Sequence, residues 1–196
     1  MIFFSLYLVN RSLPAEYMVN KQGYLFILSI YPVTDTNKIY ESKFMKNTAE
    51  KIKQAVQNAY DNYKDLDENI TMINLSDDKW SLREIIGHLI DSASNNHQRF
   101  VRLQENNVLD YPIYHYNWIK IEKINDLPFK ILLDFWKNYN ELLSHIIKNA
   151  DEKKLHNTWK LPDRELTLEF IIVDYLRHLN EHLDHFAERL AEIRQK

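Results

Sequence analysis

Hydrophobic residues from Met45 onward recur at intervals of three and four positions, which predicts amphipathic helices. The apolar stripes fall at about 48–63, from 81, from 128, and from 167 almost to the end of the chain. Four helices of this kind indicate an all-α protein, a four-helix bundle. About 20 residues separate the second and third helices, too many for a tight antiparallel turn. We therefore expect a crossover that leaves these two helices parallel, with the aromatic connector YPIYHYNW (111–118) packed over one end of the bundle.

The second helix has the clearest start signal in the chain, in the stretch WSLREIIGHL. Ser81 is placed to cap the helix, and Glu84 is placed to return the hydrogen bond, which is the pattern of a capping box. Trp80 and Ile85 stand at the positions of a hydrophobic staple. The helix is therefore predicted to begin directly after Ser81.

The pattern changes sharply before Met45. The apolar runs MIFFSLYLVN and GYLFILSIYPV are each about half of the roughly 20 residues that a membrane span needs. The first run has no basic region before it and no small-residue cleavage site after it, so we do not expect a signal peptide. We interpret residues 1–44 as an extension outside the domain, or as a start assigned upstream of Met45; short strands or a loose flap are the alternative. Residues 45–196 are predicted to form the bundle domain.

The composition of the chain limits the chemistry that it can perform. Two glycines in 196 residues disfavour both a β-rich fold with tight turns and a phosphate-binding loop. A net charge of −3, with both signs interspersed, gives no electrostatic reason to bind nucleic acid or an anionic membrane. The absence of cysteine excludes disulfides, iron–sulfur clusters and cysteine-ligated zinc. Any metal must be held by histidine or carboxylate side chains, in a protein that we expect to be cytoplasmic.

Three histidines lie close together in the last predicted helix, in YLRHLNEHLDHF. His178, His182 and His185 fall within an arc of roughly 60° beside the apolar stripe, at the edge of the core. His178 and His185 are about 10.5 Å apart along the axis, whereas two nitrogens on one ion lie within roughly 4 Å of each other. This helix can therefore supply only two ligands to one ion, either His178 with His182 or His182 with His185.

The best candidate for a third ligand is His88 on the second helix. It belongs to a polar stripe at helical spacing, together with Glu84, Ser92, Asn95 and Arg99. If the second and fourth helices pack side by side, His88 faces the histidine pair. Three imidazoles leave coordination positions open, which suits a catalytic site better than a structural one.

Two carboxylates are candidates to orient the ligands. Asp174 precedes His178 by four residues and Asp91 follows His88 by three, so each is placed to accept a hydrogen bond from an imidazole and fix its tautomer. The alternative to a metal site is a set of core-edge histidines that bond to backbone or solvent. No Glu-x-x-His motif of a di-iron carboxylate centre occurs. The histidines interpreted as surface or loop residues without a catalytic role are His97, His115, His145 and His156.

The order of these motifs resembles the DinB-like (DinB/YfiT) superfamily of four-helix bundles. The resemblance rests on KWSLREIIGHLIDSASNNHQRF, on ELTLEFIIVDYLRHLNEHLDHF after a long gap, and on LDFWKNYNELLSHI with the connector that ends at Trp118. It covers about 45–194. Each motif is degenerate alone, but a histidine in GHLID followed by a late His-x-x-x-His is a fairly specific combination.

The resemblance implies a metal triad of His88, His178 and His182 that holds Zn²⁺ or Ni²⁺, since imidazole suits both ions. It implies a transferase that adds bacillithiol, mycothiol or glutathione to an electrophile, or a metal-dependent hydrolase that uses the same site. Because the chain has no cysteine, a thiol must be an external small-molecule cosubstrate, and Arg99 is a candidate to bind its carboxylate. The third hypothesis is a helical bundle without enzymatic activity that binds a small molecule or forms a homodimer.

Overall fold

The computed structural model describes residues 17–19, 25–27, 35–114 and 117–195, and the chain divides into two compact units, 1–39 and 40–196. In the first unit, β1 (Tyr17–Val19) and β2 (Leu25–Ile27) pair as an antiparallel hairpin. Short strands therefore occur in the segment before Met45, whereas the run MIFFSLYLVN lies outside the described residues. That this segment is an extension outside the domain stays a prediction.

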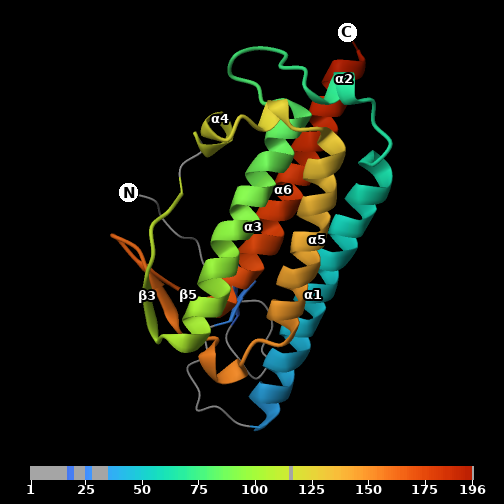
Figure 1. The fold of residues 1–196 in the computed structure, drawn as a ribbon. Coiled ribbons are helices and arrows are strands. Elements are labelled where there is room, and N and C mark those ends of the chain that lie inside the picture. Colours follow the sequence, from blue (N-terminus) through green and yellow to red (C-terminus); the bar gives the residue numbers. More distant parts are fainter. Residues whose placement is uncertain (1–16, 20–24, 28–34, 115–116, 196) are drawn as a thin grey trace. The chain divides into compact units, whose positions relative to one another are not determined.

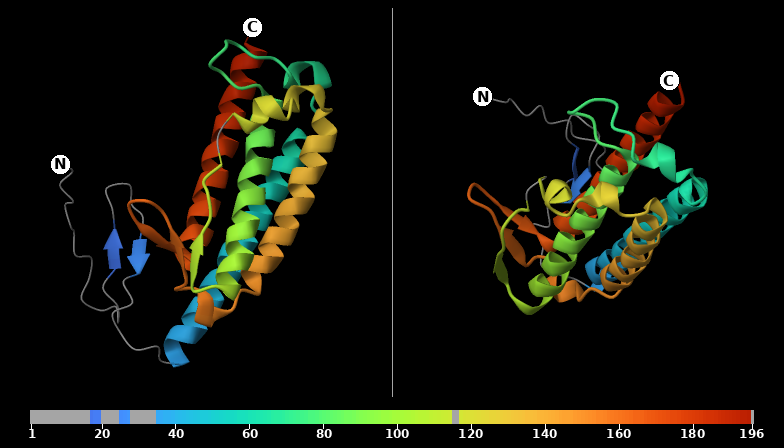
Figure 2. Two further views of the ribbon diagram at one scale, coloured as in Figure 1. Left: turned by 60° about the vertical axis from the view of Figure 1, so that its left-hand side comes forward. Right: turned by 45° about the horizontal axis from the view of Figure 1, so that its top comes forward.

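Four long helices, the first of which begins five residues before the second unit, lie side by side along most of their length (Figure 1). They are α1 (Asp35–Tyr63), α3 (Leu82–Glu105), α5 (Phe129–Lys148) and α6 (Leu168–Arg194). The colour gradient shows that α3 and α5 run in the same direction and that α6 runs opposite to them (Figures 1 and 2). The predicted four-helix bundle, with a crossover between two parallel helices, is confirmed.

The helix starts follow the sequence signals closely. The Ser81 side chain accepts from the Glu84 backbone N–H at 3.1 Å, and the Glu84 carboxylate accepts from the Ser81 N–H at 2.8 Å, so the capping box is present. Thr167 caps α6 in the same way, by accepting from the Phe170 N–H at 3.2 Å. Helix α5 begins directly after Pro128, as predicted.

Helix α1 differs from its prediction, because it begins at Asp35 rather than near residue 48. Phe44 packs against the core, Met45 is buried, and the Thr48 hydroxyl donates to the Phe44 carbonyl oxygen at 3.0 Å. The helix therefore continues through the point where the sequence pattern seemed to change. The expected start was wrong because the segment DTNKIYESKF is mostly polar and carries no continuous apolar stripe.

Short elements connect the four helices. Those between α1 and α5 are α2 (Glu68–Thr71), β3 (Val108–Asp110), α4 (Trp118–Ile121) and the 3₁₀ turn η1 (Ile124–Asp126). Those between α5 and α6 are the 3₁₀ turn η2 (Glu152–Lys154), β4 (Thr158–Lys160) and β5 (Glu165–Thr167). Strand β4 pairs in parallel with β3 and antiparallel with β5, so the two connections share one small sheet.

The sequence suggested that the connector between α3 and α5 packs over one end of the bundle, but the structure places it elsewhere. Tyr111 accepts a hydrogen bond at its carbonyl from the Trp159 indole at 2.8 Å, near the end of α3, whereas Tyr114 reaches His88, near its beginning. The connector therefore runs along the side of α3, from its C-terminal end toward its N-terminal end (Figure 1). Its pairing with β4 directs it along the flank, and this pairing had no visible signal in the sequence.

Two residues of α3 fix the end of the crossover. The buried Arg83 guanidinium donates to the carbonyl oxygens of Asn125 at 2.8 Å and Leu127 at 2.9 Å. At Gly87 a Cβ would lie 2.8 Å from the Cγ2 of Ile124, closer than real Cβ contacts come. The missing side chain thus lets η1 approach the helix directly before His88.

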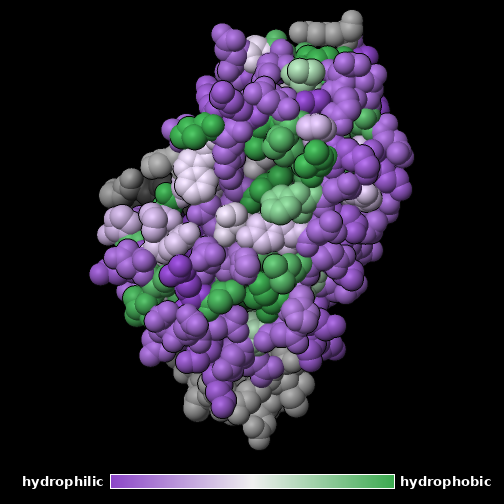
Figure 3. All heavy atoms as spheres, in the orientation of Figure 1, coloured by the Kyte–Doolittle hydropathy of each residue, from purple (hydrophilic) through white to green (hydrophobic). Residues whose placement is uncertain are grey.

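The surface over α3 and α5 mixes hydrophilic residues with a group of hydrophobic ones near its middle (Figure 3). The exposed large hydrophobic residues of α5 are Ile131, Phe135 and Leu142. Among the residues that the structure describes, no helix combines the length and the apolar character that crossing a membrane would require.

Candidate metal centre

Helices α3 and α6 bring His88, His178 and His182 together. The Nε2 atom of His88 lies 3.4 Å from the Nε2 of His178 and 3.1 Å from the Nε2 of His182. One nitrogen from each ring lies within 4.8 Å of the other two. Three nitrogens bound tetrahedrally at about 2.1 Å would lie about 3.4 Å apart, so the cluster has the spacing of metal ligands. That these three residues bind a metal stays a prediction.

Burial keeps these imidazoles in the form that a metal requires. His88 is 0% exposed, and burial, followed by the neighbouring histidines, lowers its pKa to about 3. The same causes lower the pKa of His182 to about 4, and burial also lowers the pKa of His178. All three rings are therefore neutral at pH 7, and a neutral ring nitrogen has the lone pair that coordinates an ion.

The outer nitrogens of two rings face hydroxyl groups. The Nδ1 of His88 lies 3.4 Å from the Tyr114 hydroxyl, and the Nδ1 of His178 lies 3.3 Å from the Ser92 hydroxyl. With the proton on Nδ1, both rings direct an unprotonated Nε2 toward the common centre. The buried Nδ1 of His182 has no hydrogen-bond partner among the described residues.

The two carboxylates expected to orient the ligands have other partners. Asp174 forms an ion pair with Arg177, at 2.7 Å. Asp91 is 4% exposed, its Oδ2 has no hydrogen-bond partner among the described residues, and it lies near Glu122. Burial, followed by repulsion from Glu122, raises the pKa of Asp91 to about 7. The hydroxyls of Tyr114 and Ser92 face the Nδ1 atoms of His88 and His178, and a role of Asp91 and Asp174 in orienting these rings stays a prediction.

His185 does not join the cluster. Its Nε2 lies 3.4 Å from a terminal nitrogen of Arg189, whose guanidinium also donates to the Trp80 carbonyl oxygen. The Trp80 ring covers the histidines, with its centroid 5.0 Å from that of His88 and 6.3 Å from that of His182. The sequence suggested only that Trp80 is part of a hydrophobic staple. In the structure its ring also lies beside the rings of His88 and His182.

The remaining histidines lie apart from the cluster. His97 faces the Tyr139 hydroxyl at 3.0 Å, and His145 faces the Asn149 side chain at 3.4 Å. His156 is exposed, and His115 lies outside the described residues. His97, His145 and His156 are not part of the group of possible metal ligands formed by His88, His178 and His182.

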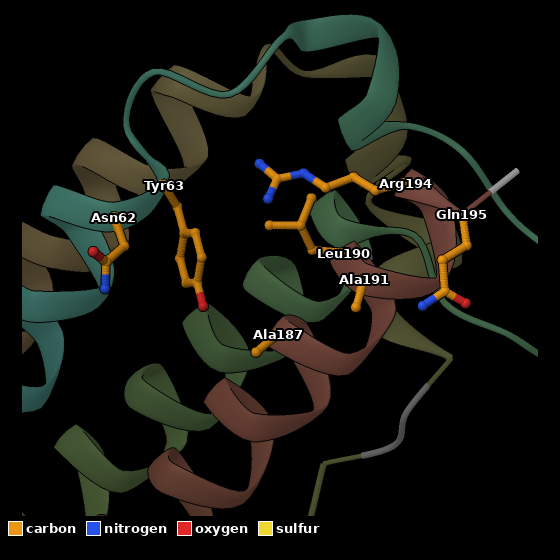
Figure 4. A pocket seen from close by; sticks show the side chains of 7 residues that line it. All are labelled: Asn62, Tyr63, Ala187, Leu190, Ala191, Arg194 and Gln195. Atoms are coloured by element: carbon orange, nitrogen blue, oxygen red, sulfur yellow. The ribbon is translucent and has the colours of Figure 1, made fainter.

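A pocket of about 360 Å³ adjoins the cluster, because His178 forms part of its wall. Its other residues come from α3, the connector, the small sheet and α6: Ser92, Asn96, Arg99, Ile113, Tyr114, Trp159, Leu161, Arg164, Leu166, Phe170, Ile171, Asp174 and Tyr175. A larger hollow of about 590 Å³ lies between α1 and α6, where the Tyr63 ring points toward Ala187 (Figure 4). None of the candidate ligands lines that hollow, so the smaller pocket is the one that belongs to the site.

Sequence reasoning did not assign a role at the site to Tyr114, Trp80 or Trp159. Tyr114 and Trp159 come from segments whose path depends on the pairing of β3 with β4. The sequence signal for a role of the connector at the site was the density of aromatic residues in YPIYHYNW. A simple crossover does not need aromatic residues, because a polar connector is sufficient.

The sequence profile of the DinB superfamily matches residues 31–186. The chain belongs to the DinB superfamily. A relative from Halalkalibacterium halodurans, named "Putative metal-dependent hydrolase BH0277", is 28% identical over 127 residues, which cover 64% of this chain and 74% of that protein. The fold is similar to that of YfiT from Bacillus subtilis, described as a probable metal-dependent hydrolase with an unusual four-helix bundle topology. That match has a TM-score of 0.62 and 16% identity, and covers 85% of this chain and 93% of YfiT.

The DinB-superfamily match agrees with the resemblance seen in the motifs. Together, the family, the name of the relative and the geometry of the three histidines support a metal-binding protein and point to a divalent ion. They do not distinguish one divalent ion from another, since imidazole binds several of them.

Proposed function

We propose that this DinB-superfamily protein is a metal-dependent transferase that conjugates an external low-molecular-weight thiol to an electrophile. The proposal rests mainly on the position of His178. This residue belongs to the three-histidine cluster and also lines a pocket large enough for a small molecule. A molecule in this pocket would have its reactive end beside the metal ligands.

The cluster fits a divalent ion by its donor chemistry. Three neutral imidazole nitrogens suit Zn²⁺ or Ni²⁺, and the described residues add no fourth histidine or carboxylate to the group. A divalent ion held there would supply Lewis acidity, which activates a thiol or a water molecule at neutral pH.

The protein's own side chains prepare the site around that ion. The hydroxyls of Tyr114 and Ser92 hold the tautomers of His88 and His178. The Trp80 ring lies against one side of the cluster. A thiol nucleophile suits this site, because a thiol ionises readily and needs no general base beside it.

A metal-dependent hydrolase that uses the same ligands is the second candidate. The name of the relative BH0277 and the description of YfiT favour it. Both reactions need the three histidines, so substitution of a ligand cannot distinguish them. They differ in whether turnover depends on an added thiol.

The test measures turnover with and without a thiol. Purified protein loaded with Zn²⁺ or Ni²⁺ is given bacillithiol, mycothiol or glutathione together with a bimane electrophile, and in parallel an activated ester without thiol. We expect thiol consumption that His178→Ala abolishes and His97→Ala leaves unchanged, since His97 lies outside the cluster. Ester cleavage without thiol would instead support the hydrolase. Inactivity in both assays would reject both enzymes and favour a bundle that binds a small molecule.

A further inference from the structure

The pocket beside His178 contains a buried cation that has no acidic partner among the described residues. Arg99 is 5% exposed and lines this pocket. Its guanidinium has one hydrogen bond among the described residues, to the Asn96 side-chain oxygen at 3.3 Å, and its Nε has none. Burial lowers the pKa of Arg99 to about 10, so the side chain stays charged at neutral pH. A buried charge without a counter-ion is costly, which suggests that a ligand supplies the missing anion.

The other charges of the pocket are compatible with one bound anion. Arg164 is a second cation in the lining, and Asp174 is its acidic residue. Arg177 pairs with the Asp174 carboxylate at 2.7 Å and so reduces its repulsion of an anion. Asp163 likewise pairs with the Arg164 guanidinium at 3.3 Å, so Arg99 is the charged lining residue without an ion pair among the described residues, and it contributes one positive charge. That balance matches a monoanion better than a phosphate dianion.

The surroundings of Arg99 also indicate what adjoins the anion. The guanidinium lies over the Trp159 ring, 3.9 Å from its centroid, which holds it flat against β4. Much of the remaining wall is apolar, with Leu161, Phe170 and Ile171 among its residues. A ligand with a carboxylate next to an apolar body would therefore pair its charge with Arg99 and bury its body against the wall.

The positions of Arg99 and the histidines set the length of such a ligand. Eleven positions separate His88 from Arg99 on α3, about 16 Å along the axis. Because long helical side chains lean toward the helix start, the guanidinium lies nearer to the histidines than its backbone does. The distance that a ligand must span is therefore on the order of 10 Å, about three extended residues.

We infer that this pocket binds an elongated monocarboxylate, with the carboxylate on Arg99 and the reactive end about 10 Å away at the three histidines. The identity of the reactive end rests on the proposed function, but the carboxylate site does not. The two parts can therefore be tested separately.

The carboxylate site is tested by binding, without metal or turnover. The full chain is titrated with 3-phenylpropionate and with the neutral 3-phenylpropionamide, and the arginine Nε–H signals are followed by NMR. We expect the carboxylate to bind about tenfold or more tightly than the amide and to shift the Arg99 signal. Arg99→Met should remove this preference. Arg102→Met is the matched control, because Arg102 also lies over an aromatic ring of the connector, Tyr111 at 5.7 Å, but is exposed outside the pocket.

Equal binding of acid and amide by the unmodified protein, or an unchanged preference in Arg99→Met, would overturn the carboxylate site. If Arg99→Met does not fold, Arg99→Lys replaces it, since it keeps the charge and loses the planar guanidinium. A lysine variant that binds acid and amide equally would support the inference, and one that binds the acid as tightly as the unmodified protein would contradict the need for an arginine.

The length of the ligand is tested with protein loaded with Zn²⁺. We expect the metal to tighten binding of 8-mercaptooctanoate at least tenfold, and to tighten binding of 3-mercaptopropionate much less, because the shorter acid cannot reach both sites. Equal tightening would contradict the 10 Å spacing. Acid binding that persists with no effect of the metal on either thiol would leave the Arg99 site standing and reject the metal–thiol step of the proposed function.

Discussion

At the scale of single residues, the orientation of His185 decides which histidines can share an ion. Its ring faces Arg189 at 3.4 Å, whereas His88, His178 and His182 face one another. We therefore expect His88→Ala or His178→Ala to abolish stoichiometric binding of Zn²⁺, and His185→Ala to retain it. The measurement is metal content by mass spectrometry after dialysis. Circular dichroism should show a folded bundle in each variant, because the rings contribute little to the apolar core.

The opposite pattern would identify a different pair of ligands. If His185→Ala loses the metal and His178→Ala keeps it, His182 and His185 are the ligands on α6. His97→Ala serves as the control for loss of a histidine away from the cluster, since its ring faces Tyr139.

Asp91 should make stability depend on pH. Its pKa is raised to about 7, first by burial and then by Glu122, so the folded protein holds a proton that the unfolded chain releases near pH 4. This stabilisation is complete at low pH and is lost as the pH rises through about 7. Asp91→Asn removes the effect, so the variant should gain stability relative to the unmodified protein between pH 5 and pH 8, on the order of 2 kcal/mol. Urea unfolding at both pH values measures it.

The matched control for this prediction is Asp163→Asn, which removes an exposed carboxylate. Its difference from the unmodified protein should change little with pH. If the difference between Asp91→Asn and the unmodified protein is also constant from pH 5 to pH 8, the Asp91 carboxyl does not hold the proton.

Residue spacing predicted the possible ligands because a helix fixes the distance between its own side chains. His178 and His182 lie one turn apart on α6, and one further histidine at the edge of the facing helix was enough to suggest the set. Spacing could not predict the contacts of Tyr114 and Ser92, because both depend on how separate elements pack against each other.

At the scale of elements, the early start of α1 gives a test of the N-terminal segment. Deleting residues 1–34 leaves all of α1, so we expect the melting temperature to change little. Deleting residues 1–44 also removes Phe44, which packs against the core and accepts the Thr48 hydroxyl. That second deletion should cost about 1–3 kcal/mol, through the loss of one partly buried ring and one hydrogen bond. Thermal and urea unfolding of both variants provide the measurement. An equally large loss on deleting 1–34 would mean that the first segment itself stabilises the bundle.

The four long helices were predictable because each has a long periodic stripe, and α3, α5 and α6 also have a recognisable start. Ser81 and Thr167 act as caps at the predicted positions. Strands β3, β4 and β5 were not predicted, since each has three residues and their stability comes from pairing across the sequence. A three-residue segment is too short to show an alternating pattern.

At the scale of the whole molecule, the length of one connection predicted the topology. A crossover between α3 and α5 leaves these helices parallel and brings the connector along the flank, where it meets the small sheet (Figure 1). The pocket is built there, from the connector, the sheet and two helices. The same topology that sets the order of the helices thus also encloses the pocket beside His178. A homodimer stays a prediction, which sedimentation of the full chain would test.

The position of Trp80 also gives the protein an optical signal of its own. Its indole lies 5.0 Å from the His88 ring and 6.3 Å from the His182 ring, within reach of an ion bound between them. Zn²⁺ has a filled d shell, whereas Ni²⁺ does not, and an open-shell ion at this distance quenches indole fluorescence. Adding Ni²⁺ should therefore dim the emission of the protein at one equivalent, and Zn²⁺ should do so much less. In Trp80→Phe most of that dimming should disappear, so emitted light alone would report which ion occupies the three histidines.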